Sequence, residues 1–135
     1  MAEAILVHML GPGHEASVDS AGTGAWHTGE EPDRRTQLEL ARNGTQWVST
    51  ARQVQTADFE EFDHLVAMDH QNLRDLLRWP GAEKSRVSLL MDWAGETDTP
   101  VPDPYYGGSV EFRLVYDMCH RACLAIRSRL FTPNV

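Results

Sequence analysis

Hydrophobic positions along the chain predict short strands that alternate with helices. His64 to Met68 (HLVAM) and Val87 to Met91 (VSLLM) are apolar without alternation, which is typical of strands buried on both faces. Ala16 to Asp19 is a further strand candidate, and Arg52 to Gln55 can form a brief extended piece. The pattern therefore predicts an α/β domain with a parallel sheet covered on both faces. We expect residues 1–135 to form one domain.

Caps and helix breakers predict the helices around these strands. Gly11, Pro12 and Gly13 should end a first helix, and Asn43-Gly44 should end a second. The predicted helices span Met1 to Leu10, Pro32 to Asn43, the residues from Asp69 to before Pro80, and Ser109 to Leu130. In the last helix, Leu114, Met118, Ala122 and Ile126 lie four apart, and this spacing predicts a buried stripe.

Charge and composition restrict the partners. The chain has 12 basic and 20 acidic side chains, a net charge of −8 and a pI near 5.1. Such a surface repels phosphate backbones and anionic lipid, so we expect no nucleic-acid or membrane partner. No apolar run reaches the ~20 residues of a membrane-spanning helix. Two cysteines make no disulfide framework, which favours a reduced, cytoplasmic setting.

A polar loop from Ala94 to Gly108 carries the first candidate chemistry. Asp103 lies between Pro102 and Pro104, and a residue before proline is pushed toward an extended conformation. A carboxylate restricted in this way is a candidate general acid, with tyrosines beside it as an aromatic wall. The alternative is a turn in which Asp103 bonds its own backbone, and the residues alone slightly favour that turn.

The glycine-rich stretch DSAGTGAWH (Asp19 to His27) is the second candidate. Its glycines would let the backbone approach a neighbouring loop, and Trp26 with His27 could form a rim that stacks on a ring. A plain strand-to-helix turn with Trp26 filling a gap is the other interpretation, and spacing alone favours it.

Cys119 and Cys123 fall on one face of the last helix and are interpreted as small core residues. No second cluster completes a metal site, so we expect neither a metal nor a cofactor. Cys123 to Arg129 formally satisfies a C-x5-R pattern. That pattern cradles phosphate only as a loop with converging N–H groups, so a helical copy is rejected as an active site.

Several motifs taken together resemble the low-molecular-weight protein tyrosine phosphatases. They are MAEAI, VDSAGTGAWH, ARQV, FDHLVAMD, NLRDLL, VPDPYYGG and FRLVYDMCHRACLAI, and they cover nearly the whole chain. The resemblance implies a doubly wound parallel sheet and hydrolysis of phosphotyrosine proteins or small aryl phosphates through a cysteinyl-phosphate. It also implies that Asp103 is the general acid, that Ser20 supports the nucleophile loop, and that Trp26, Tyr105 and Tyr106 line the substrate pocket.

The family's first strand and C-x5-R-[ST] loop precede the helix that begins with MAEA, which is residues 1–4 here. We therefore expect about four strands without the first, no nucleophile among these residues, and no activity as written. We also expect Met1 to be an internal methionine. Loss of a central strand predicts low stability, or a homo-oligomer through exposed strand edges.

Two alternatives remain open beside an incomplete phosphatase. One is an inactive relative that acts as a binding or regulatory protein. The other is an arsenate reductase on the same fold. It ranks last because that chemistry relays a disulfide between cysteines near the site, and no cysteine occurs before Cys119.

Overall fold

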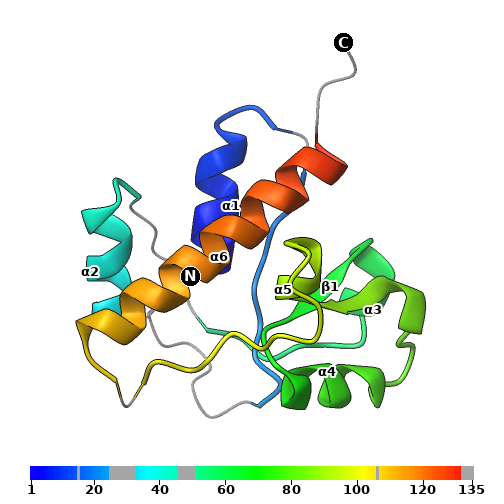
Figure 1. Cartoon of the computed structure of the whole chain (residues 1–135). Coiled ribbons are helices and arrows are strands. Elements are labelled where there is room, and N and C mark those ends of the chain that lie inside the picture. Colours follow the sequence, from blue (N-terminus) through cyan, green and yellow to red (C-terminus); the bar gives the residue numbers. More distant parts are fainter. Residues whose placement is uncertain (15, 25–32, 46–50, 106, 132–135) are drawn as a thin grey trace.

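The computed structural model describes residues 1–14, 16–24, 33–45, 51–105 and 107–131. Trp26, His27 and Tyr106 therefore lie outside the described residues. Figure 1 shows the described elements, which are α1 (Ala2–Leu10), α2 (Arg34–Arg42), α3 (Asp58–Glu61), β1 (Leu65–Ala67), α4 (His70–Leu77), the 3-10 helix η1 (Lys84–Arg86), β2 (Val87–Leu89), α5 (Leu90–Trp93) and α6 (Ser109–Leu130). None of the helices in these ranges is both long and apolar enough to span a bilayer.

The sheet is parallel, as the apolar runs predict. β1 pairs with β2 in the register Leu65 with Val87 and Ala67 with Leu89, and α4 and η1 form the crossover between them. A single parallel bridge also joins Gly22 to Gln53. Within the described ranges the ladder has two strands, fewer than the four expected, but the α/β class with parallel strands is confirmed.

The strand predicted for Ala16 to Asp19 is wrong. These residues form no ladder with any described strand. A strand requires a neighbour about 4.8 Å away. Instead, Ala16 to Asp19 and β1 both line a cleft. An apolar local pattern predicts burial, but it cannot provide the partner that turns an extended segment into a strand.

Side-chain caps and a glycine mark the ends of α2 and α4. The cap at Asp69 and the turn at Asn43-Gly44 are those that the sequence predicts, whereas Pro32, the predicted start of the second helix, lies outside the described residues. Asp33 begins α2, because its carboxylate accepts a hydrogen bond from the N–H of Arg35. Asp69 begins α4 in the same way through the N–H of Asn72. The backbone of Gly44 adopts a φ of 81° after α2, so the helix-ending turn at Asn43-Gly44 is confirmed.

The long helix α6 has the predicted bounds, and one position of its predicted stripe is wrong. Met118, Ala122 and Ile126 are buried, whereas Leu114 is 49% exposed. Val115 is buried in its place. An α-helix repeats every 3.6 residues, so a stripe drawn at a strict spacing of four drifts off the buried face.

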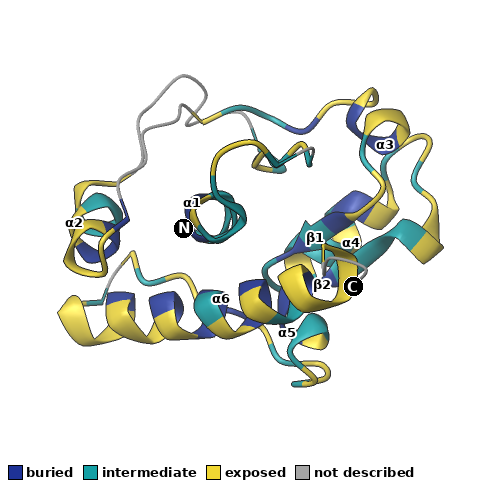
Figure 2. Cartoon of the chain, turned by 90° about the horizontal axis from the view of Figure 1, so that it is seen from above, coloured by how far each residue is buried: buried dark blue, intermediate teal, exposed yellow. Residues whose placement is uncertain are grey.

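The core has two clusters that meet at the sheet. The first joins α1, α5 and α6, and the second joins β1, β2, α3 and α4. Leu65 and Ala67 of β1 belong to the second cluster, while Val66 between them packs against the first. Because alternate side chains of a strand point to opposite faces, helices cover both faces of this sheet. Figure 2 shows the buried side of α6 turned toward α1.

Candidate active site

The loop that carries Asp103 is attached to the end of β1. The backbone N–H of Val101 donates to the carbonyl oxygen of Met68 at 2.8 Å, and the side chain of Val101 is buried. Asp103 follows two residues later and is exposed. In parallel α/β sheets, ligands bind outside the carboxyl ends of the strands. The anchor at Val101 therefore places Asp103 near the edge of the sheet where chemistry is expected.

A turn fixes one oxygen of the Asp103 carboxylate. Its Oδ1 accepts a hydrogen bond from the N–H of Tyr105 at 3.0 Å, and the N–H of Gly107 donates to the carbonyl of Pro104 at 2.8 Å. The self-bonded turn considered from the sequence is therefore present. The Asp103 carboxylate remains exposed in this turn, and its Oδ2 has no hydrogen bond to another residue that the structure describes. Asp103 can therefore form this turn through Oδ1 and still have its carboxylate available as a proton donor.

Tyr105 lies beside a cation from α2. Its side chain is 54% exposed, and the guanidinium carbon Cζ of Arg35 lies 5.4 Å from the centre of its ring. Hydrogen bonding to Asp33 raises the pKa of Arg35 above its ordinary value, and the charges of Tyr105 and Asp103 act in the same direction. This loop and the start of α2 are thus electrostatically coupled.

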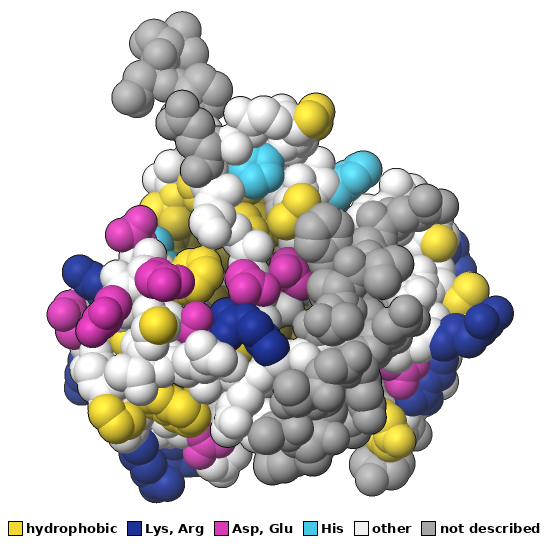
Figure 3. Space-filling view, turned by 180° about the vertical axis from the view of Figure 1, so that it is seen from behind, with side chains coloured by type: hydrophobic (Ala, Val, Ile, Leu, Met, Phe, Trp, Pro, Cys, Tyr) yellow, Lys and Arg dark blue, Asp and Glu magenta, His cyan; other side chains and the backbone are white. Residues whose placement is uncertain are grey.

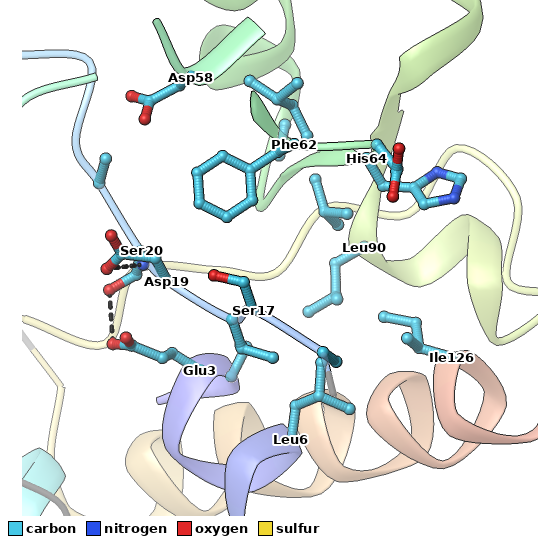
Figure 4. Close-up of a pocket in the computed structure, with 18 of the residues that line it drawn as sticks. Glu3, Leu6, Ser17, Asp19, Ser20, Asp58, Phe62, His64, Leu90 and Ile126 are labelled. Carbon is cyan, nitrogen blue, oxygen red and sulfur yellow. Dashed lines mark hydrogen bonds between the residues drawn. The ribbon is translucent and has the colours of Figure 1, made fainter. Parts of the chain in front are cut away.

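Ser20 is held by the first turn of α1. Its Oγ donates a hydrogen bond to Oε1 of Glu3 at 2.7 Å, and its N–H donates to Oδ1 of Asp19 at 2.8 Å (Figure 4). Both Ser20 and Glu3 line the cleft. The hydroxyl is therefore oriented toward the amino end of α1, where backbone N–H groups favour negative charge.

Arg52 attaches the segment before Ser20 to α3. Its guanidinium bonds both carboxylate oxygens of Asp58, at 2.9 and 3.0 Å, and its Nε bonds Asp19 at 3.1 Å. Burial alone would raise the pKa of Asp58, but hydrogen bonds from Arg52 and Gln55 outweigh it and lower that pKa. The same contacts raise the pKa of Arg52. This network fixes one wall of the cleft.

A cleft of about 1040 Å³ lies between the segment from Ala16 to Ser20 and β1, and residues of α1 and α6 form part of its lining. The close-up in Figure 4 places Leu6, Leu90 and Ile126 around its apolar part, with Ser20 and Glu3 at one side. Figure 3 shows acidic and hydrophobic side chains side by side on one face of the molecule. Asp103 and Tyr105 do not line this cleft. The structure therefore gathers Ser20 and Glu3 at the cleft and leaves the Asp103 loop outside it.

Both cysteines are buried core residues of α6, as the sequence predicts, and neither forms a disulfide. Burial raises the pKa of the Cys119 thiol to about 11. Burial, followed by the neighbouring Cys119, raises the pKa of the Cys123 thiol to about 12. A nucleophilic cysteine must be a thiolate near neutral pH. These two side chains therefore cannot act as nucleophiles, and the C-x5-R pattern from Cys123 to Arg129 lies within α6.

The structure adds three residues that the sequence analysis did not identify, and two predicted residues lie outside the described ranges. Glu3, Arg35 and Arg52 were missed from the sequence, although each contacts a candidate residue or its immediate neighbour. Their partners lie 17, 72 and 33 positions away for the pairs Glu3–Ser20, Arg35–Gly107 and Arg52–Asp19, so no local pattern identifies them. Trp26 and Tyr106, which are predicted to line the substrate pocket, lie outside the described ranges. Among the described residues, no group of three side chains is arranged to bind a metal ion.

The fold and the Asp103 loop define an α/β domain with an exposed carboxylate beyond the end of a parallel strand, and comparisons with known proteins give its family. Residues 1–132 match the family described as low molecular weight phosphotyrosine protein phosphatase. A protein of that description from Schizosaccharomyces pombe is 44% identical over 98 residues, which are 71% of this chain and 63% of the yeast protein. A low molecular weight protein-tyrosine-phosphatase from Streptomyces coelicolor is 41% identical over 130 residues, which are 90% of this chain and 79% of its own.

A solved structure gives the same result. The protein tyrosine phosphatase from Entamoeba histolytica, crystallised with Hepes in its active site, superimposes with a TM-score of 0.87 at 35% identity. The match covers 96% of this chain and 86% of the amoebal chain. The chain belongs to the low molecular weight phosphotyrosine protein phosphatase family. It spans less than two thirds of the length of the yeast relative.

Proposed function

We propose that this domain provides the proton donor and pocket walls for hydrolysis of phosphotyrosine proteins or small aryl phosphates. The observation that carries the proposal is the attachment of the Asp103 loop to the end of β1 through Val101 and Met68. It presents an exposed carboxylate at the sheet edge. Tyr105 and, from the family resemblance, Trp26 and Tyr106 provide the aromatic walls. The free thiols fit the expected cytoplasmic setting.

The role of Asp103 follows from the leaving group. A tyrosyl oxygen has a pKa near ~10 and leaves phosphorus poorly unless it is protonated as the bond breaks. In the proposed reaction a thiolate attacks phosphorus, the P–O bond breaks, and Asp103 transfers its proton to the departing oxygen. Asp103 then accepts a proton from the water that hydrolyses the cysteinyl-phosphate.

The nucleophile does not come from the cysteines of this sequence. Both are buried in α6, with pKa values of about 11 and about 12. We therefore expect the 135-residue chain to show no turnover of an aryl phosphate. Ser20, held by Glu3 at the amino end of α1, would support a thiolate loop supplied in front of that helix.

The test joins a strand and a C-x5-R-[ST] loop of the kind that the family resemblance implies to the amino end of this chain. This protein is called the loop-extended chain below. It should release phenol from phenyl phosphate, whereas the 135-residue chain should not. Asp103→Asn should lower kcat/KM of the loop-extended chain by roughly 10²- to 10⁴-fold.

Asp98→Asn is the matched control, because Asp98 lies on the same loop and its carboxylate bonds His70. That variant should retain activity. Equal losses in the two variants, or no loss with Asp103→Asn, would contradict the role proposed for Asp103.

One observation favours a second function, that of a binding protein. Among the described residues, β1 has a ladder partner on one edge only, its residues line the cleft, and Ala16 to Asp19 forms no ladder. A second copy of this chain could cover these edges, which would give a homo-oligomer without activity. Sedimentation velocity at increasing concentration tests this. A constant monomeric sedimentation coefficient with a cooperative urea transition that is independent of concentration would exclude it.

A further inference from the structure

Arg35 connects the start of α2 to the loop that carries Asp103 and to the first turns of α6. Its Nε and Nη2 donate to the two carboxylate oxygens of Asp33, at 3.2 and 3.1 Å. Its Nη1 donates to the carbonyl oxygen of Gly107 at 3.3 Å. Its Cζ lies 5.4 Å from the ring centre of Tyr105 and 4.7 Å from that of Phe112. All three guanidinium nitrogens are therefore engaged within the protein.

The partners of Arg35 differ in burial and in the kind of element that carries them. Asp33 is the N-cap of α2, and Phe112 is 3% exposed in the first turns of α6, so both belong to well-packed elements. Gly107 and Tyr105 belong to the exposed loop that carries Asp103. A planar guanidinium that bonds a fixed carboxylate and lies over a buried ring is itself fixed. Arg35 thus joins an exposed loop to the packed elements α2 and α6.

The contact with Gly107 reaches Asp103 through the turn. The N–H of Gly107 donates to Pro104, and the N–H of Tyr105 donates to the Asp103 carboxylate. Movement of Gly107 or of the Tyr105 ring would therefore change the direction of the carboxylate. On the other side of the loop, Val101 is anchored to Met68. Arg35 provides a second attachment, so the loop is held at both ends.

We propose that Arg35 is a positioning residue for the Asp103 loop, and that it sets the direction of the Asp103 carboxylate and of the Tyr105 ring. The catalytic meaning of this role rests on the function proposed above. The structural part does not, because it concerns contacts within the 135-residue chain. A bound anion is not required, since the guanidinium is occupied by Asp33 and Gly107.

Amide hydrogen exchange of the 135-residue chain, followed by NMR, tests the structural part. In Arg35→Met, the N–H groups of Tyr105 and Gly107 should exchange about five- to tenfold faster relative to the amides of Val115 and Cys119 in α6. Arg35→Lys should give a smaller increase, because an ammonium keeps the charge but loses the planar fork. Arg34→Met, at the exposed neighbouring position, is the matched control and should leave the ratio unchanged. An unchanged ratio in Arg35→Met would overturn the proposal.

The loop-extended chain tests the catalytic part. Arg35→Met should lower kcat/KM more for aryl phosphates with poor leaving groups than for those with good ones, because misplacing an acid matters most when the leaving group needs its proton. Equal losses across the series would show that Arg35 acts only on stability or binding, and would overturn this role.

The two proposals fail in different ways. If Asp103→Asn keeps full activity, the proton-donor function fails, and the exchange ratio still decides whether Arg35 holds the loop.

Discussion

The hydroxyl of Ser20 donates a hydrogen bond to the carboxylate of Glu3 at 2.7 Å, and the two residues lie 17 positions apart in the sequence. The hydrogen bond joins the glycine-rich segment to the first turn of α1, where a negative side chain also interacts favourably with the helix dipole. Because Ser20 is exposed, solvent competes for this bond. It therefore orients the serine more than it stabilises the fold.

A double-mutant cycle with Ser20→Ala and Glu3→Gln measures this pair. We expect a coupling free energy of about 0.5–1 kcal/mol in urea unfolding, since a hydrogen bond to a charged but exposed group contributes modestly. Ser17→Ala, an exposed serine on the same segment, is the control and should not couple to Glu3. Full additivity of the Ser20 and Glu3 changes would show that the bond does not form in solution.

Arg52→Met should destabilise the protein by about 1–3 kcal/mol at pH 7, because it leaves the buried carboxylate of Asp58 without its two guanidinium bonds. Arg121→Met is a matched control. Arg121 also bonds both oxygens of a carboxylate, that of Glu96, but the pair is exposed and should contribute less than about 1 kcal/mol. Urea unfolding measures the loss of unfolding free energy in each of the two variants.

The effect of Arg52 should depend on pH. The pKa of Asp58 is lower in the folded state than its ordinary value of 3.8. Its stabilisation is therefore complete above pH 3.8 and is lost as the pH falls through the folded pKa. The difference between wild type and Arg52→Met should persist from pH 7 to pH 5 and shrink below pH 3.8. A difference independent of pH down to pH 2 would contradict an ionised Asp58 partner.

Neighbouring glycines in the Asp103 loop should respond differently to alanine. A Cβ at Gly107 would lie 2.6 Å from both Cβ and Cγ of Glu111, whereas a Cβ at Gly108 would come no closer than 3.6 Å to another atom. Gly107→Ala should therefore cost about 1–3 kcal/mol, as forced overpacking does, and Gly108→Ala less than about 1 kcal/mol. Thermal unfolding compares them, and equal shifts of Tm would argue against this turn geometry.

The two thiols should be inert in the native state. At pH 8 neither Cys119 nor Cys123 should react with a disulfide reagent unless denaturant is present, because their pKa values are about 11 and about 12. The unfolded thiols titrate near 9.0, so the unfolded state loses protons first as the pH rises. Stability should therefore fall between pH 9 and about pH 11. The Cys119→Ala/Cys123→Ala variant should lack this part of the pH dependence.

Local signals account for what the sequence predicts correctly. The bounds of α6, the cap Asp69 and the turn at Gly44 each depend on residues within a few positions of one another. The parallel strands at Leu65–Ala67 and Val87–Leu89 follow from apolar runs without alternation. The segment from Ala16 to Asp19 alternates apolar and polar residues and finds no partner strand among the described residues, because pairing is a property of two segments.

The candidate site was predictable only in part. Two prolines identify Asp103 as a restricted carboxylate, and the structure adds the turn that fixes its Oδ1. Its role as a proton donor remains a prediction. The contact of Arg35 with Gly107 spans 72 positions, and nothing in the spacing of either residue indicates the other. Such contacts depend on how α2 and α6 pack, which local patterns do not specify.

The two core clusters predict that this small domain does not open as one unit. Among the described residues, the cluster of α1, α5 and α6 and the cluster of β1, β2, α3 and α4 meet at the two-stranded sheet. Each can act as a foldon, with its own free energy of sub-global unfolding. Ser20 is bonded to α1, and its neighbour Asp19 is bonded through Arg52 to α3. The glycine-rich segment therefore joins two partly independent folding units. A change in the unfolding free energy of one unit would alter that of the other.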